Sequence, residues 1–103
     1  MVAIYKLWHE FLPHFPKDSK YTLGTKVDSL FLDTIESIVK ASNSDKLDKL
    51  ISLKTASLKL DMLKFFLQLC WEIKSIDNKK YILISEKINE IGKMLGGWIK
   101  AVK

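Results

Sequence analysis

The sequence predicts an all-α fold: an up-down antiparallel four-helix bundle in which residues 1–103 form a single domain. Apolar residues recur at intervals of three and four in four separate segments, and no segment alternates apolar and polar residues as a strand would. Only a few residues separate the segments, and short connections join antiparallel neighbours. A composition of 48% hydrophobic and 28% charged residues suits a soluble globular domain of this length.

The first two predicted helices are separated by a segment that contains both prolines. The first helix has an apolar face made of Ile4, Leu7, Trp8, Phe11 and Phe15. It closes in the stretch LPHFPKDS, because Pro13 and Pro16 cannot continue a helix. The second amphipathic run spans residues 23–39 and fades at residues 41–44.

The third and fourth helices are the longest predicted elements. Ser42, with Asp45 three residues later, is typical of an N-terminal cap, and the third helix is expected from about Asp45 to Ser75. Asp77 is expected to cap the fourth helix, which then runs to about Val102.

The third helix carries two apolar stripes, and only a narrow wedge of it is polar. One stripe consists of Leu47, Ile51, Leu58, Met62, Phe65, Leu69 and Ile73. The other consists of Leu53, Ala56, Leu60, Leu63, Leu67 and Cys70. Because a small bundle buries one stripe of each helix more easily than two, the second stripe is assigned to a subunit interface. Leu53, Leu60, Leu63 and Leu67 are its predicted contacts.

Three of the four glycines lie in one stretch of the fourth helix, IGKMLGGWIK. Each glycine inside a helix costs roughly 1 kcal/mol relative to alanine. On a helical wheel Ser85, Gly92 and Gly96 form a smooth strip beside the apolar face, where another helix could approach closely. Gly92 and Gly96 are therefore added to the predicted interface. The alternative is that Gly96 and Gly97 fray the end of the helix.

The net charge is +5, and all seventeen basic residues are lysine. Residues 1–44 are balanced, whereas residues 45–75 carry six lysines against four acids and residues 76–103 six against three. Lysine is a mobile point charge without the planar fork of arginine, so contact with a phosphate backbone is favoured over reading of bases. The predicted nucleic-acid-binding set is Lys64, Lys74, Lys79, Lys80, Lys87 and Lys93.

Three blocks of sequence resemble a known family. FPKDSKYTLGTKV (residues 15–27), LDMLKFFLQL (residues 60–69) and EIGKMLGGWIK (residues 90–100) are similar to the accessory variability determinant of diversity-generating retroelements, bAvd. Its wider relatives are four-helix bundles encoded in intervening sequences of 23S ribosomal RNA. The resemblance implies a ring-like homopentamer whose basic surface binds RNA or DNA and a partner reverse transcriptase, in support of mutagenic retrohoming. The helical periodicity does not indicate five subunits.

The resemblance also implies particular basic positions. Lys17, Lys20 and Lys26 fall where the family has basic residues around its first block, and they join the predicted binding set. Lys64 falls on an arginine of the family's second block, and Lys93 stands directly before MLGGW. Gln68 replaces a second arginine of that block, which weakens the implied patch.

Enzyme chemistry has little support in the sequence, and no catalytic residue, metal or cofactor is expected. His9 and His14 are five residues apart, a spacing that does not place two ligands on one helix face. Cys70 lies in an apolar stripe and is expected to be a buried, unreactive thiol. Packing is expected for Trp8, Trp71 and Trp98, and a solvated face for Asp28, Asp33 and Glu36.

Two function classes remain open. The first is a non-enzymatic accessory protein that assembles as a ring and binds nucleic acid and a reverse transcriptase. The second is a stand-alone oligomeric helical scaffold that binds only proteins. The lack of a long apolar run and of a secretory signal indicates a cytoplasmic protein without a membrane span, which a single cysteine also suits.

Overall fold

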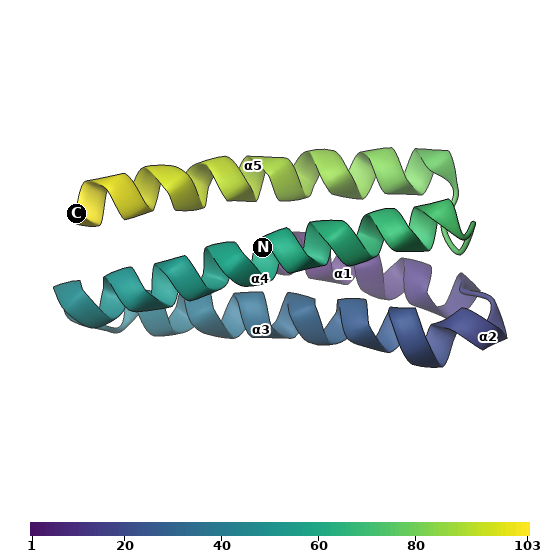
Figure 1. Cartoon of the computed structure of the whole chain (residues 1–103), viewed down its shortest axis with the longest axis horizontal. Helices are drawn as coiled ribbons and strands as arrows, with labels where there is room; N and C mark the ends of the chain where they lie inside the picture. Colours follow the sequence, from purple (N-terminus) through teal and green to yellow (C-terminus); the bar gives the residue numbers. More distant parts are fainter.

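The structure, a computed structural model, describes all 103 residues and is built from helices alone. Four longer helices, α1 (Val2–Phe11), α3 (Thr25–Ser42), α4 (Lys46–Glu72) and α5 (Asn78–Val102), form an elongated bundle of 43 × 21 × 19 Å (Figure 1). A 3₁₀ turn (Leu12–His14), the short α2 (Lys17–Ser19) and a π-helical segment (Lys20–Gly24) connect α1 to α3. The all-α prediction and its four helical segments are confirmed.

The two longest helices begin at aspartate caps. Asp45 accepts a hydrogen bond from the Asp48 N–H at 3.1 Å, and Asp77 accepts one from the Lys80 N–H at 2.8 Å. Each carboxylate satisfies an amide that has no partner within its helix and complements the positive helix end. The predicted cap at Asp77 is correct. The one at Ser42 is wrong, because Ser42 still belongs to α3 and donates its hydroxyl to Ile38 O at 3.1 Å.

The connection between α1 and α3 consists of several short helical turns rather than one irregular loop. Pro13 lies in the 3₁₀ turn, and Phe15 is extended with ψ of 143°, so that its ring enters the core. The π-helical segment then leads directly into α3. A Cβ at Gly24 would lie 2.9 Å from Leu12 Cδ1, so a larger residue here would displace the Leu12 side chain.

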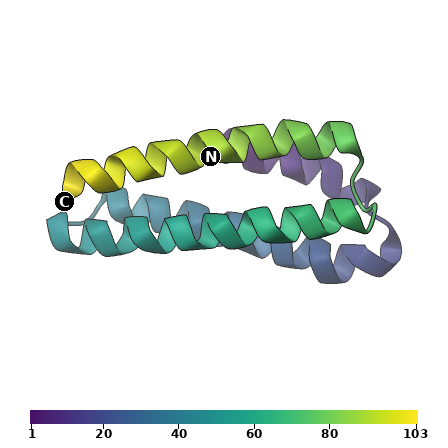
Figure 2. The same ribbon diagram turned by 45° about the horizontal axis from the view of Figure 1, so that its top comes forward.

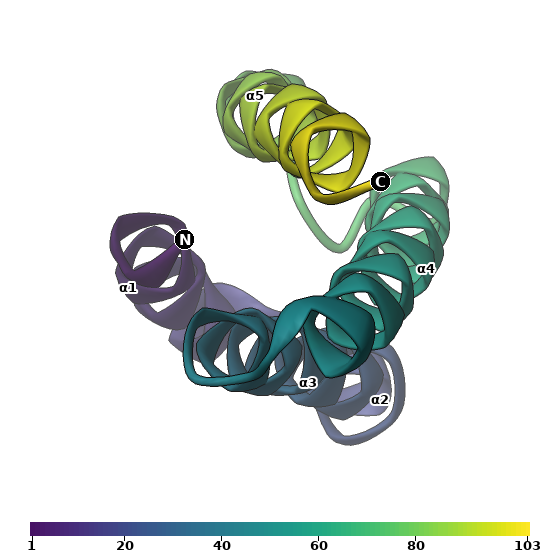
Figure 3. The same cartoon turned by 90° about the vertical axis from the view of Figure 1, so that its left-hand side faces the viewer.

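The helices are arranged as an open arc when viewed along the bundle (Figure 3). α3 and α4 are antiparallel neighbours, α5 packs along α4, and α1 lies against both α3 and α5. Figure 2 shows α4 and α5 side by side over their full length. Because α1 has 10 residues and α5 has 25, α1 accompanies only part of α5, and the chain begins midway along the bundle (Figure 1).

Aromatic side chains join α1 to the rest of the core. The Trp8 side chain is fully buried, edge-on to Phe15 with ring centroids 5.3 Å apart and stacked on Phe31 at 5.9 Å. Its indole N–H donates to Asp28 Oδ1 at 3.2 Å. Ile84, Ile88 and Leu95 of α5 complete this core from the opposite side. Trp8 is therefore a structural residue, as predicted.

The stripe of α4 that was predicted to face another subunit is the one buried in this chain. Leu53, Leu60, Leu63 and Leu67 are at most 1% exposed and belong to the core of this one chain, so a neighbouring subunit cannot use them as an interface. Their stripe keeps an unbroken three-four spacing from residue 53 to 70, and Ala56 and Cys70 allow close approach. The stripe left exposed consists of Leu47, Ile51, Leu58, Met62, Phe65 and Ile73, with Leu69 half-buried.

Candidate nucleic-acid interface

A polar groove between α4 and α5 brings two of the predicted lysines together. Lys64 of α4 and Lys93 of α5 both line it, although 29 positions separate them in the sequence. The groove has a volume of about 380 Å³, and its other lining residues are Ser57, Leu60, Asp61, Asn89 and Gly92. Two cations beside amide and hydroxyl groups suit a phosphate, whereas Asp61 reduces the local positive charge.

The glycines of α5 have different surroundings. A Cβ at Gly92 would lie 3.3 Å from Lys64 Nζ and 3.6 Å from Leu60 Cδ2, so Gly92 packs against α4 of its own chain. This corrects its assignment to a subunit interface. A Cβ at Gly96 or Gly97 would meet no atom within 4 Å. Gly96 is thus free to face another subunit, and the helix continues through both glycines to Val102 rather than fraying there.

A second group of predicted lysines lies where α2 meets the turn between α4 and α5. The hydroxyls of Ser19 and Ser75 are hydrogen-bonded at 2.7 Å, and both serines are buried. This contact joins two segments that are 56 positions apart and places Lys17 and Lys20 on the same end of the bundle as Lys74. Figure 1 shows α2 and the α4–α5 turn at this end.

Two further lysines near this end lie over aromatic rings. Lys26 Nζ lies 5.7 Å from the centre of the Phe66 ring, and Lys80 Nζ lies 5.4 Å from that of Phe11. Such cation–π contacts hold an ammonium group near the surface without neutralising it. Lys79 is exposed on the first turn of α5.

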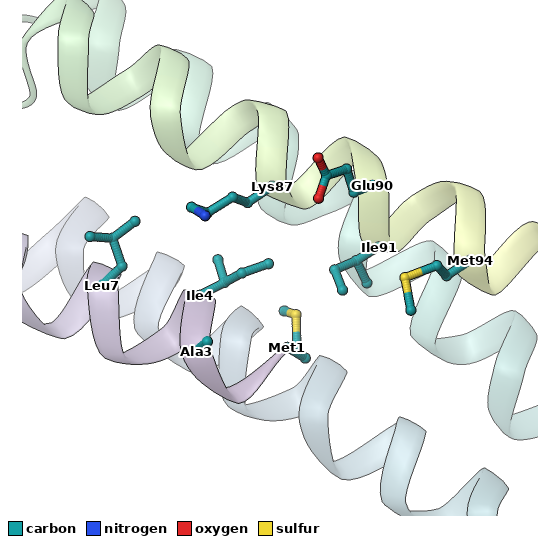
Figure 4. A pocket seen from close by; sticks show the side chains of 8 residues that line it. All are labelled: Met1, Ala3, Ile4, Leu7, Lys87, Glu90, Ile91 and Met94. Carbon is teal, nitrogen blue, oxygen red and sulfur yellow. The ribbon is translucent and has the colours of Figure 1, made fainter.

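Lys87 lies apart from the other predicted lysines. It projects from α5 toward α1 and lines a cavity of about 400 Å³ with Glu90, Ile4 and Leu7 (Figure 4). Lys87 therefore does not join Lys64 and Lys93 in the α4–α5 groove.

The acidic residues of the chain leave the predicted binding lysines unpaired. The two ion pairs in the structure join Lys40 to Glu36 at 3.3 Å and Lys59 to Asp33 at 3.6 Å. None of the nine predicted lysines takes part in either. Asp28 and Asp33 are also not simply a solvated face, because Asp28 accepts from Trp8 and Asp33 connects α3 to α4.

The remaining candidate residues have structural surroundings. Cys70 is buried, which raises the pKa of its thiol from 9.0 to about 11 and keeps it protonated at neutral pH. Trp71 stacks on Tyr81 with ring centroids 5.0 Å apart and donates its indole N–H to Asn78. His9 and His14 are exposed, and no group of three His, Cys, Asp or Glu side chains could hold a metal ion.

A comparison with protein families identifies the chain. A family model described as bAvd-like matches residues 2–102. The chain belongs to the bAvd-like family. No curated protein and no solved structure matches this bAvd-like chain. None of its helices combines the length and the apolar character that crossing a membrane requires.

Proposed function

We propose that this bAvd-like protein is a non-enzymatic, cytoplasmic accessory of a diversity-generating retroelement. It binds RNA or DNA with low sequence specificity and acts with a partner reverse transcriptase in mutagenic retrohoming. Membership of the family supports the accessory role. The single observation that carries nucleic-acid binding is the set of nine predicted lysines that have no carboxylate partner within the chain.

The chemistry of these side chains favours the phosphate backbone as their ligand. An unpaired ammonium group releases counterions from nucleic acid when it binds a phosphate, so affinity falls as salt rises. The chain has no arginine, whose planar fork is the common reader of guanine. Binding should therefore depend on charge and salt far more than on sequence.

Self-assembly would multiply this charge. Leu58 and Phe65 are 62% and 60% exposed on the outer stripe of α4, and a contiguous exposed apolar stripe is typical of an interaction surface. A ring needs two different faces on each subunit, and Gly96 offers a second, uncrowded one. A homopentamer, as the family resemblance implies, would present about +25 to a polyanion, five times the +5 of one chain.

Fluorescence anisotropy with mixed-sequence RNA and DNA at two salt concentrations tests the proposal. Lys64→Gln with Lys93→Gln removes the cations of the α4–α5 groove and should weaken binding to both and reduce the salt slope. Lys46→Gln with Lys49→Gln makes the same charge change at the start of α4, away from the groove, and should have a smaller effect. Absence of binding by the wild type at about 50 mM salt would refute nucleic-acid binding.

One observation favours the protein-scaffold alternative. Met1, Ile38, Ile91, Met94, Leu95 and Trp98 line an apolar cavity of about 340 Å³ beside the part of α5 that α1 does not cover. An apolar cavity of this kind suits a protein side chain better than a phosphate. The scaffold would assemble normally but show no salt-dependent binding to RNA or DNA.

A further inference from the structure

The end of the bundle where α2 meets the α4–α5 turn combines charge with an exposed aromatic ring. The hydrogen bond between Ser19 and Ser75 fixes the two segments against each other. Tyr21 follows Ser19 by two residues and Lys74 precedes Ser75, so both lie within a few residues of this contact. Lys17 and Lys20 flank Ser19 on the same short segment.

Tyr21 is not part of the core. At 71% its exposed fraction is the highest among the large hydrophobic and aromatic side chains that face solvent. The nearby partner of its ring is Lys20, whose Nζ lies 5.7 Å from the ring centre. The ring is thus an apolar surface of about the size of a base, beside a cation and open to water.

Lys74 occupies a backbone conformation that usually belongs to glycine. Its φ of 65° is the only positive value in the chain. The residue closes α4, with the Ser75 N–H donating to Cys70 O at 2.8 Å and the Lys74 N–H donating to Trp71 O at 3.0 Å. A side chain at this position is strained because its Cβ crowds the backbone, whereas glycine would not be. A cation is present where stability alone favours glycine, which is a pattern expected of a functional site.

We propose that this end of the bundle binds single-stranded nucleic acid, with a base stacked on Tyr21 and phosphates bound by Lys17, Lys20 and Lys74. The inference rests on the proposed function and narrows it from nucleic acid in general to unpaired strands. Bases within a duplex already cover each other's faces, so an exposed ring can stack only on an unpaired base. Lysines without an aromatic platform, as in the α4–α5 groove, bind either form.

Binding of a labelled RNA strand of about 20 nucleotides, and of the matching duplex, distinguishes the two modes. Tyr21→Ser should weaken binding of the single strand at least about fivefold and leave the duplex unchanged. Tyr21→Phe keeps the ring and should bind the single strand nearly as the wild type does. Equal losses for strand and duplex, or no loss for the strand, would show that Tyr21 is not a stacking platform.

Lys74→Gly provides a second, independent measurement. It should raise the thermal midpoint, because it relieves the positive φ, while it weakens binding of the single strand. A variant that is more stable and binds as well as the wild type would exclude Lys74 from the site. If the wild type binds neither strand nor duplex, the proposed function fails first. If the wild type binds both strand and duplex and Tyr21→Ser binds the single strand equally well, nucleic-acid binding stands and this inference alone is wrong.

Discussion

The indole N–H of Trp8 donates to Asp28 Oδ1 at 3.2 Å and thereby joins the middle of α1 to the first turns of α3. Trp8 is fully buried and Asp28 half-buried, so the carboxylate is the partner that this buried donor has within the chain. Burial raises the pKa of the nearby Tyr5 phenol, and the Asp28 carboxylate raises it further. Asp28 is therefore a connecting residue of the fold.

Replacement of Asp28 by alanine should reduce the free energy of unfolding by about 1 to 3 kcal/mol, because a buried donor loses its partner. Asp28→Asn keeps an acceptor oxygen and should cost less. Urea denaturation followed by circular dichroism measures both variants. Equal stability of Asp28→Ala and the wild type would show that the hydrogen bond contributes nothing.

Charges placed on the outer stripe of α4 should disrupt self-assembly and leave the fold intact. Leu58→Lys with Phe65→Lys alters two side chains that are more than half exposed, and the helical content should not change. Light scattering should give a mass well above the 11.9 kDa of one chain for the wild type and close to it for the variant. Leu63→Lys, a core substitution, is the contrasting control and should unfold the chain. A wild-type monomer at micromolar concentration would contradict the assembly proposal.

Substitutions of the α5 glycines should distinguish contacts within the chain from contacts between chains. Gly92→Leu should destabilise the fold by about 1 to 3 kcal/mol, because its side chain would meet Leu60 and Lys64. Gly96→Leu has open space and should leave the fold stable but weaken assembly. A side chain at Gly97 has as much open space as one at Gly96, so Gly97→Leu is the matched control. The mass of its assembly in solution should equal that of the wild type. If Gly96→Leu and Gly97→Leu assemble alike, Gly96 is not at an interface.

Cys70 should make the fold sensitive to alkaline pH. Its folded pKa of about 11 is above the ordinary value of 9.0, so its stabilising contribution is complete below pH 9 and is lost as pH rises toward 11. That loss amounts to about 2 kcal/mol at pH 11. Urea denaturation at pH 8 and pH 11 should show a smaller decrease for Cys70→Ala than for the wild type. The same decrease in both would mean that other groups cause it.

Much of the fold could be predicted because its signals are local. Pro13, Pro16 and the Asp77 cap act on their own segments, so helix ends follow from a few neighbouring residues. Which stripe of α4 is buried within the chain could not be predicted as well. Both stripes are apolar, and the positions of the other helices decide which one is covered. The unbroken spacing from Leu53 to Cys70 was the available signal. In the exposed stripe this spacing is interrupted, because Lys54 and Thr55 stand where an apolar residue would be needed between Ile51 and Leu58.

The candidate site was less predictable than the fold. The proximity of Lys64 and Lys93 depends on the register between α4 and α5, which no local pattern specifies. The π-helical segment has no periodic signature of its own, so the exposure of Tyr21 and the Ser19–Ser75 contact were not expected. Charge counting located the excess of lysines correctly in the chain but could not show which of them share a surface.

The unequal lengths of α1 and α5 should divide the bundle into parts that open at different rates. Met1 reaches α5 near Ile91, Met94 and Trp98, and the final turn of α5 lies beside Lys46 and Leu50 of α4 instead. Backbone amides of residues 99–102 should therefore exchange with deuterated water through local unfolding, well before those near Ile84 and Ile88. A neighbouring molecule that covers the last turn of α5 would slow this exchange, so the exchange rate of these amides would report on assembly.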